Sequence, residues 1–149
     1  MTETGLLIRK ATPDDADAIF VLVAEFATSF RPEKEAFLVS LKSLLPDESA
    51  LLAVAELDGD VVGYCLGFDH YAFYANGRVS WVEEIMVRTD LRKKGIGRAL
   101  METLEVWAEE RGSKLVGLAT RRAAPFYKAL GYEDSAVFFR KLLGELKAG

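Results

Sequence analysis

The chain has 149 residues, half of them hydrophobic, and a formal net charge of −4 at pH 7. This length and composition suit a single domain, residues 1–149, with enough buried surface for one core. The lone Cys65 excludes an internal disulfide, and the lone His70 excludes a metal site built on two or more histidines, so we expect no metal. Because there is no long apolar run and no signal-peptide pattern, we expect a cytoplasmic protein.

The charge is unevenly divided along the chain. Residues 1–60 hold 5 Lys or Arg against 12 Asp or Glu, whereas residues 61–149 hold 14 against 11. A basic second part that binds an anion and an acidic first part that attracts a cation would fit this division, although solubility alone also explains the acids. The overall acidity disfavours nucleic acid as a partner.

The first third of the chain reads as one strand followed by two helices. Leu6–Lys10 is predicted as a strand, and Thr12, followed by a proline and two aspartates, is typical of a helix start. The apolar spacing keeps this helix in phase to Ser29. A second helix is predicted over residues 31–45.

A hairpin and an aromatic loop are predicted next. Ala50–Leu57 and residues 61–68 are β-rich runs separated by Asp-Gly-Asp, a strong hairpin signal. Residues 69–78 are predicted to form a loop that carries His70, Tyr71 and Tyr74. Rings on a loop suggest a pocket wall, so these three side chains are candidate contacts to a ligand. For His70, ordinary packing within the loop is the alternative.

The most informative stretch, residues 81–112, reads as strand, basic turn and helix. Its apolar run at residues 81–87 contains the pair Glu83 and Glu84. The helix that follows has apolar residues at helical spacing on one face, namely Ile96, Leu100, Leu104 and Trp107.

The turn between this strand and helix has the features of an anion site. Gly95 and Gly97 allow backbone N–H groups to approach a ligand, and the start of a helix favours phosphate. The turn contains one acidic residue, Asp90, and five basic residues. The basic residues are Arg88, Arg92, Lys93, Lys94 and Arg98. The sequence therefore predicts a polyanionic ligand, with a solvated surface loop as the alternative.

Two other phosphate loops do not match these residues. A Walker loop is excluded because no glycine is followed by Lys and then Ser or Thr. The dinucleotide fingerprint GxGxxG is not complete, because Leu100 stands where the third glycine is needed. The predicted strand that follows also lacks the Asp or Glu that the fingerprint requires at its end.

The remainder of the chain is predicted to complete the sheet. Residues 114–120 read as a strand, and residues 123–130 read as a short helix that stops at Gly131. Residues 137–142 are predicted as a last strand on their aromatic and β-branched content, and residues 144–149 as a frayed tail.

The segment Arg92-Lys93-Lys94-Gly95-Ile96-Gly97 resembles the acetyl-CoA motif [RQ]xxGxG of the GNAT family of N-acetyltransferases. A second family hallmark is similar to APFYKALGY at residues 124–132, so the resemblance spans roughly residues 81–132. It implies an α/β fold with a mixed, mostly antiparallel sheet of six to seven strands flanked by about four helices. It also implies acetyl-CoA as cofactor, a small-molecule amine as acceptor, and a homodimer.

The resemblance also implies which residues bind the cofactor. They are Ile85, Met86, Val87, Arg92, Lys93, Lys94, Gly95, Ile96, Gly97, Arg98, Thr120, Phe126 and Tyr127. Backbone N–H groups of Met86 and Val87 would polarise the thioester carbonyl where a β-bulge opens the sheet. Thr120 stands where many members have an asparagine that bonds the pantetheine arm, and it could replace that residue only in part.

Acyl transfer to an amine needs a base for the amine and a proton for the departing thiolate. The resemblance makes Tyr127 the acid, with packing in an apolar helix stripe as the alternative. Glu83 or Glu84 would be the base, and strand alternation places them on opposite faces. We favour Glu83, because VEEIMV looks like the LEDLYV strand of the diamine acetyltransferase branch. A bulge could reverse the facing, and solvent exposure or an ion pair with Arg78 is the non-catalytic alternative.

The acceptor side is predicted to include Phe26 and Phe30, besides His70, Tyr71, Tyr74, Glu83 and Glu84. A polyamine, a diamine or a lysine-like amino acid is the first candidate acceptor, because DHYAFY at residues 69–74 also resembles the diamine branch. An aminoglycoside or a protein amino group comes second. A non-catalytic CoA-binding regulator is the alternative to an enzyme.

Overall fold

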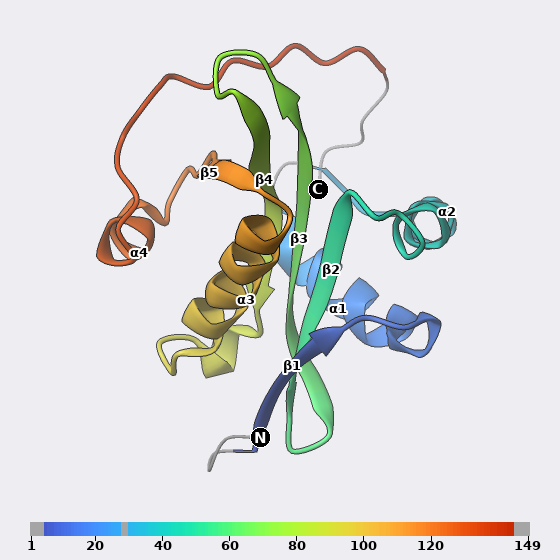
Figure 1. Ribbon diagram of the computed structural model, residues 1–149. Coiled ribbons are helices and arrows are strands. Elements are labelled where there is room, and N and C mark those ends of the chain that lie inside the picture. The colour runs from blue at the N-terminus through green and yellow to red at the C-terminus, as the bar shows by residue number, and fades with distance from the viewer. Residues whose placement is uncertain (1–4, 28–29, 145–149) are drawn as a thin grey trace.

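A computed structural model describes residues 5–27 and 30–144 (Figure 1). Its five strands form one sheet in the order of the chain: β1 (Leu6–Lys10), β2 (Ala50–Leu57), β3 (Asp60–Ala72), β4 (Gly77–Val87) and β5 (Ser113–Leu118). The strands β1 to β4 pair antiparallel with one another, and β5 runs parallel to β4. The predicted hairpin between β2 and β3 is confirmed, with Asp58 and Gly59 both at positive φ.

Four helices flank this sheet: α1 (Ala16–Phe26), α2 (Lys34–Leu44), α3 (Ile96–Glu110) and α4 (Ala124–Ala129). Two short 3₁₀ turns, η1 (Pro13–Asp15) and η2 (Thr89–Leu91), precede α1 and α3. The mixed, mostly antiparallel α/β fold and the number of helices agree with the prediction. Within the described residues, no helix has the length and the apolar character needed to cross a membrane.

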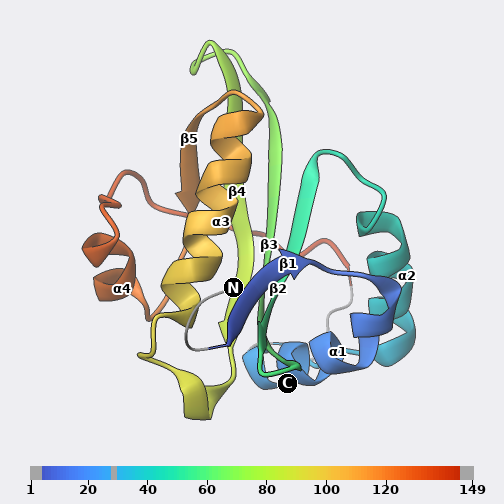
Figure 2. The same cartoon turned by 60° about the horizontal axis from the view of Figure 1, so that its bottom comes forward.

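The two faces of the sheet bury different clusters (Figure 2). On one face, α3 packs Ile96, Leu100 and Leu104 against the strands, as the helical spacing predicts. On the opposite face, which we call the open face, α1 packs Ile19 and Leu22 against the strands. The burial of these apolar side chains is the main stabilising contribution to the fold.

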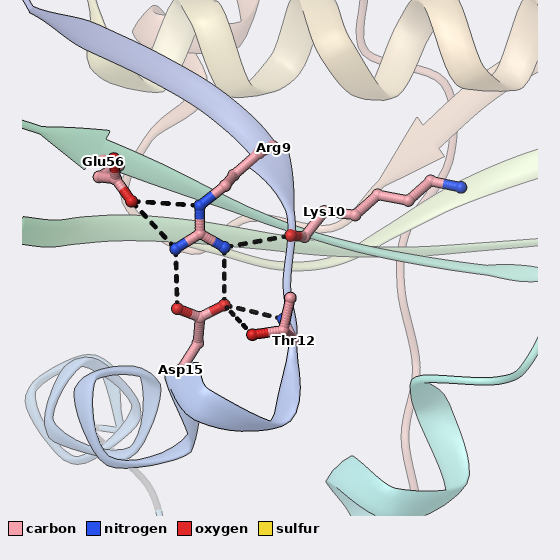
Figure 3. A network of polar contacts seen from close by, with 5 residues as sticks. All are labelled: Arg9, Lys10, Thr12, Asp15 and Glu56. Atoms are coloured by element: carbon pink, nitrogen blue, oxygen red, sulfur yellow. Dashed lines mark hydrogen bonds and ion pairs between the residues drawn. The ribbon is translucent and has the colours of Figure 1, made fainter. Parts of the chain in front are cut away.

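An ion network joins β1 to the start of α1 (Figure 3). The Arg9 guanidinium donates to both carboxylate oxygens of Asp15, at 2.8 and 2.9 Å, and also to Glu56 at 3.1 Å. Asp15 in turn accepts the backbone N–H of Thr12 at 2.8 Å, which completes a capping interaction of the kind the sequence predicts. The Arg9 guanidinium holds the pKa of the Asp15 carboxyl below its usual range.

Two predicted elements are wrong. Residues 69–78 do not form a long loop, because β3 continues to Ala72 and β4 begins at Gly77, which leaves a short hairpin turn. Residues 137–142 form no strand, so the described residues contain five strands instead of six to seven. Aromatic and β-branched side chains suit any half-buried surface, and here they cross a sheet face without pairing to a strand.

Other boundaries also differ from the prediction. The second helix is Lys34–Leu44 instead of residues 31–45. The first helix ends at Phe26, because Ala27 adopts an extended conformation, and the predicted end at Ser29 lies outside the described residues. The fifth strand is Ser113–Leu118, and the last helix is Ala124–Ala129, followed by Gly131 at positive φ as predicted. The predicted tail falls, apart from Gly144, outside the described residues.

Candidate active site

A bulge in β4 decides where the two candidate carboxylates lie. Leu66 pairs with Glu84 and Gly67 pairs with Val82, so Glu83 is an additional residue in β4. Val82 packs in the α3 cluster and Met86 packs in the α1 cluster, although the two would share a face in a regular strand. The bulge therefore reverses the alternation, and Glu84 lies with Met86 on the open face.

Glu84 is half-buried and has a specific partner. The hydroxyl of Tyr64, a fully buried residue of β3, donates to Glu84 Oε1 at 2.6 Å. Burial raises the pKa of Glu84; the Tyr64 hydrogen bond opposes this shift, and the nearby charge of Glu83 adds to it. Glu83 itself is exposed. Of the two carboxylates, Glu84 is the one that is half-buried, hydrogen-bonded and raised in pKa.

β4 and β5 separate directly beside this pair. Their parallel pairing ends at Val82 and Leu118, so the rest of β4 has no β5 neighbour. The Arg88 N–H donates to the Val62 carbonyl at 2.8 Å, and strand alternation then directs the N–H groups of Ile85 and Val87 away from β3. The carbonyl of Val87 accepts from Arg92 Nε at 3.3 Å, which agrees with this orientation.

The start of α3 lies at the end of this gap. Gly95 is the N-cap with φ +86°, and a Cβ at this position would meet nothing within 4 Å. The first N–H groups of α3 have no partner within the helix, and no side chain caps them. Lys93, Lys94 and Arg98 are exposed around them, while Arg88 pairs with Asp90 at 2.7 Å.

Helix α4 closes the other side of the gap. Tyr127 is buried in the α3 cluster, and the half-buried Ile85 and Val87 pack against this cluster. Burial raises the pKa of Tyr127, so its hydroxyl keeps its proton at neutral pH. Phe126 lies against α3, because a Cβ built on Gly97 would come within 3.3 Å of its ring.

Other predicted site residues lie farther from this centre. The Thr120 hydroxyl accepts the N–H of Ala123 at 3.0 Å, so its oxygen orients the chain before α4. His70, Tyr71 and Tyr74 are exposed near the turn between β3 and β4, and the Arg78 guanidinium lies 4.4 Å from the centre of the Tyr71 ring.

The predicted acceptor residues Phe26 and Phe30 flank the connection between α1 and α2. Phe26 is exposed at the end of α1, and Phe30 is half-buried under the guanidinium of Arg140. A surface pocket next to the C-terminal end of α3 contains none of the predicted site residues; its lining includes Lys10, Leu44, Trp107 and Arg111.

The sequence analysis missed two features of the site. Tyr64 is an inward-facing strand residue without any motif, and only its pairing with β4 places it beside Glu84. The contact of Phe138 with Trp81 was missed because residues 137–142 were predicted to form a strand.

The gap and the start of α3 fit the cofactor that the motif implies. Unpaired N–H groups at the helix start and exposed basic side chains suit a pyrophosphate, and the open space at Gly95 lets it approach the backbone. The N–H groups of Ile85 and Val87 face the gap in which an extended thiol arm would lie.

Comparison with known proteins identifies the family. Residues 16–132 match the model of the acetyltransferase (GNAT) family. The chain is 29% identical to aminoalkylphosphonate N-acetyltransferase of Salmonella typhimurium, over 91% of this chain and 90% of that protein. It is 28% identical to aminoglycoside N(6')-acetyltransferase type 1 of Stenotrophomonas maltophilia, over 94% and 95%.

A solved structure extends the comparison to a bound ligand. The structure of AAC(6')-Iy in complex with the bisubstrate analog CoA-S-monomethyl-acetylneamine is similar with a TM-score of 0.77, over 93% of this chain and 99% of that chain, at 20% identity. The family match covers most of the chain, and the relatives it resembles are N-acetyltransferases. The chain therefore belongs to the acetyltransferase (GNAT) family and is an N-acetyltransferase that uses acetyl-CoA.

Proposed function

We propose that this single-domain enzyme acetylates the primary amine of a small molecule, with Glu84 as the base and Tyr127 as the acid. The observation that carries this proposal is the half-buried Glu84, held by Tyr64 on the open face beside the gap between β4 and β5. A carboxylate in this position can meet an acceptor that comes from the open face, while the gap receives the acetyl donor from the other side.

The backbone would hold the donor in place. The first N–H groups of α3, with Lys93, Lys94 and Arg98, would bind the pyrophosphate, and Arg92 would add charge next to β4. When bound, acetyl-CoA supplies an acetyl thioester. The N–H groups of Ile85 and Val87 would lie along the arm and polarise the carbonyl. The Met86 N–H faces β3 by the same alternation, so it takes less part than predicted.

The side chains would move the protons. Glu84 would take a proton from the incoming ammonium group, either directly or through a water, and leave the amine neutral for attack. Tyr127 would donate its hydroxyl proton to the departing sulfur, which burial supports by keeping the phenol protonated. Because a thiol has a pKa of about 8.5, this donation helps the reaction without being essential.

A pair of neighbouring variants tests the assignment of the base. We expect Glu84→Gln to lower kcat/KM by about 100-fold or more and to move the acid limb of the pH profile to higher pH, because the amine must then lose its proton to solvent. Glu83→Gln is the matched control, with the same chemical change at the exposed neighbour, and should stay within a few-fold of wild type. Loss of activity in the Glu83 variant alone would reverse the assignment.

The relatives support an amine as the acceptor, but they do not indicate which kind of amine. One relative is named for an aminoalkylphosphonate and another for an aminoglycoside, so the relatives differ in the amine they use. We keep a lysine-like amino acid or a polyamine as first candidates. Thiol release from acetyl-CoA with lysine, an aminoalkylphosphonate, spermidine and an aminoglycoside would rank them. The homodimer stays a prediction, which sedimentation velocity would test.

A further inference from the structure

The chain after α4, residues 133–144, crosses the open face of the sheet from α4 toward α1 and α2 (Figure 2). We call it the C-terminal segment. Figure 2 shows it passing behind the sheet from α4 toward α1 and α2, on the face opposite α3. Two side-chain contacts fix its course. The rings of Phe138 and Trp81 stack with centroids 6.2 Å apart, and the Arg140 guanidinium lies 5.3 Å from the centre of the Phe30 ring.

These contacts place the C-terminal segment over Trp81, which neighbours Glu84 on the open face of β4. Trp81 precedes Val82 and therefore takes the open face, as does Gly117 on β5, whose built Cβ would lie 3.5 Å from the Trp81 ring. Because Glu83 is the bulged residue, the open-face side chains of β4 follow in the order Trp81, Glu84, Met86. Helix α1 covers Met86, and Phe138 covers Trp81. Glu84 lies between these two covered positions.

The C-terminal segment also brings a positive charge to this face. Arg140 lies against Phe30, at the connection between α1 and α2, and no carboxylate of residues 5–27 or 30–144 forms an ion pair with it. Its neighbour Lys141 is exposed and has the same charge. An arginine stacked on an aromatic ring keeps its planar donors free for a carboxylate or a phosphonate.

We propose that the C-terminal segment forms the outer wall of the acceptor site, where Phe138 positions the acceptor and Arg140 binds an acidic group on it. The acceptor is then an amine that also carries a carboxylate or phosphonate, such as an amino acid with a free side-chain amine. Its ammonium group meets Glu84 and its acidic group meets Arg140. This inference rests on the proposed function, because it needs Glu84 to receive the amine.

In this arrangement, Glu84 recognises the ammonium group of the acceptor and Arg140 recognises its acidic group. Glu84 attracts any ammonium group and cannot distinguish a polyamine from an amino acid. Arg140 favours the amine with an acid and opposes one with a second cation, because like charges repel. Phe138 is 59% exposed, and its stack on Trp81 is the contact that the C-terminal segment makes with β4 beside Glu84.

Neighbouring residues provide matched controls for both side chains. Arg140→Gln is compared with Lys141→Gln, which removes the same charge from the next position. Phe138→Ala is compared with Phe139→Ala, because Phe139 is 86% exposed and Phe138 is stacked on Trp81. Each variant is assayed for thiol release with lysine, an aminoalkylphosphonate and spermidine, and its acetyl-CoA affinity is measured by calorimetry.

We expect Arg140→Gln to raise KM about ten-fold for the amines with an acidic group, with kcat and acetyl-CoA affinity nearly unchanged. With spermidine, KM should stay the same or fall. Phe138→Ala should raise KM several-fold for every accepted amine, while Lys141→Gln and Phe139→Ala stay near wild type. Equal KM values in Arg140→Gln and Lys141→Gln, or turnover of spermidine alone, would overturn the inference and leave the proposed function intact. Failure of the wild type to use any amine would overturn both.

Discussion

Apart from Tyr127, the proposed donor side comes from one continuous stretch, from the end of β4 to the first turn of α3, whereas the proposed acceptor side draws on separate parts of the chain. The donor side relies on backbone N–H groups, a glycine N-cap and nearby lysines. The proposed acceptor side would combine Tyr64 from β3, Glu84 from β4, Phe30 and the C-terminal segment.

This difference explains how one family can keep its donor and change its acceptor. A backbone site depends on the local chain path, so substitutions of side chains around it alter binding little. An acceptor site made of side chains from distant segments changes with each of them. The following variants are chosen to affect one side and spare the other.

Among these further variants, the largest effect is expected for Tyr127→Phe, on the donor side. Loss of the hydroxyl should lower kcat by roughly ten-fold to a thousand-fold, because the departing sulfur loses its proton donor. Acetyl-CoA affinity should stay within a few-fold, since the ring still fills the α3 cluster. Turnover at the wild-type rate, measured by thiol release with an accepted amine, would exclude Tyr127 as the acid.

Gly95→Ala should affect the donor side alone. An alanine at φ +86° is strained by about 1–2 kcal/mol, so the start of α3 should shift and the KM for acetyl-CoA should rise about ten-fold. The KM for the amine should not change. Gly59→Ala is the matched control, because Gly59 has φ +90° and the same free space in a distant hairpin. An equal loss of affinity in both variants would indicate a general loss of stability.

Tyr64→Phe should affect the acceptor side alone. The Tyr64 hydrogen bond lowers the pKa of Glu84, so its loss raises that pKa further. The base must be deprotonated to act, so the acid limb of the kcat/KM profile should move to higher pH, with a fall of a few-fold at neutral pH. Tyr132→Phe is the control, since Tyr132 donates to Glu105 at 2.6 Å. A shift of the acid limb in this variant too would point to a global effect.

The smallest effect on activity is expected for Asp15→Asn, which is remote from both sides. It should lower the free energy of unfolding by about 2 kcal/mol, because Arg9 loses a charged partner. The pKa of Asp15 is lowered in the fold, so its contribution is present above its unfolded pKa and is lost as the pH falls through its folded pKa. Urea unfolding at pH 7 and pH 3 should therefore show a smaller difference from wild type at pH 3.

The exposed Asp14 provides the control for this variant. Asp14→Asn changes the same type of side chain in the same turn and should leave stability nearly unchanged. Unchanged stability of Asp15→Asn at pH 7, or a raised KM for either substrate, would contradict the separation of the ion network from the site.

The elements that the sequence predicted correctly have local causes. The hairpin at Asp58-Gly59 follows from residues that tolerate positive φ, and α3 follows from an apolar stripe at helical spacing. The two wrong elements depend on distant partners. Residues 69–72 extend β3 because β4 offers a pairing edge, and residues 137–142 have strand-like side chains but meet Trp81 instead of an edge.

The sequence by itself determined the family and the acetyl donor, and it predicted the glycine N-cap and the start of α3, because these depend on residue types within one short stretch. Only the tertiary structure decided that Glu84, and not Glu83, receives the hydrogen bond of Tyr64. Strand alternation alone would place Val82, Glu84 and Met86 together, but the bulge moves Glu84 and Met86 to the face of Tyr64. A bulge depends on how two strands pair, and one strand read alone carries no record of its partner's register.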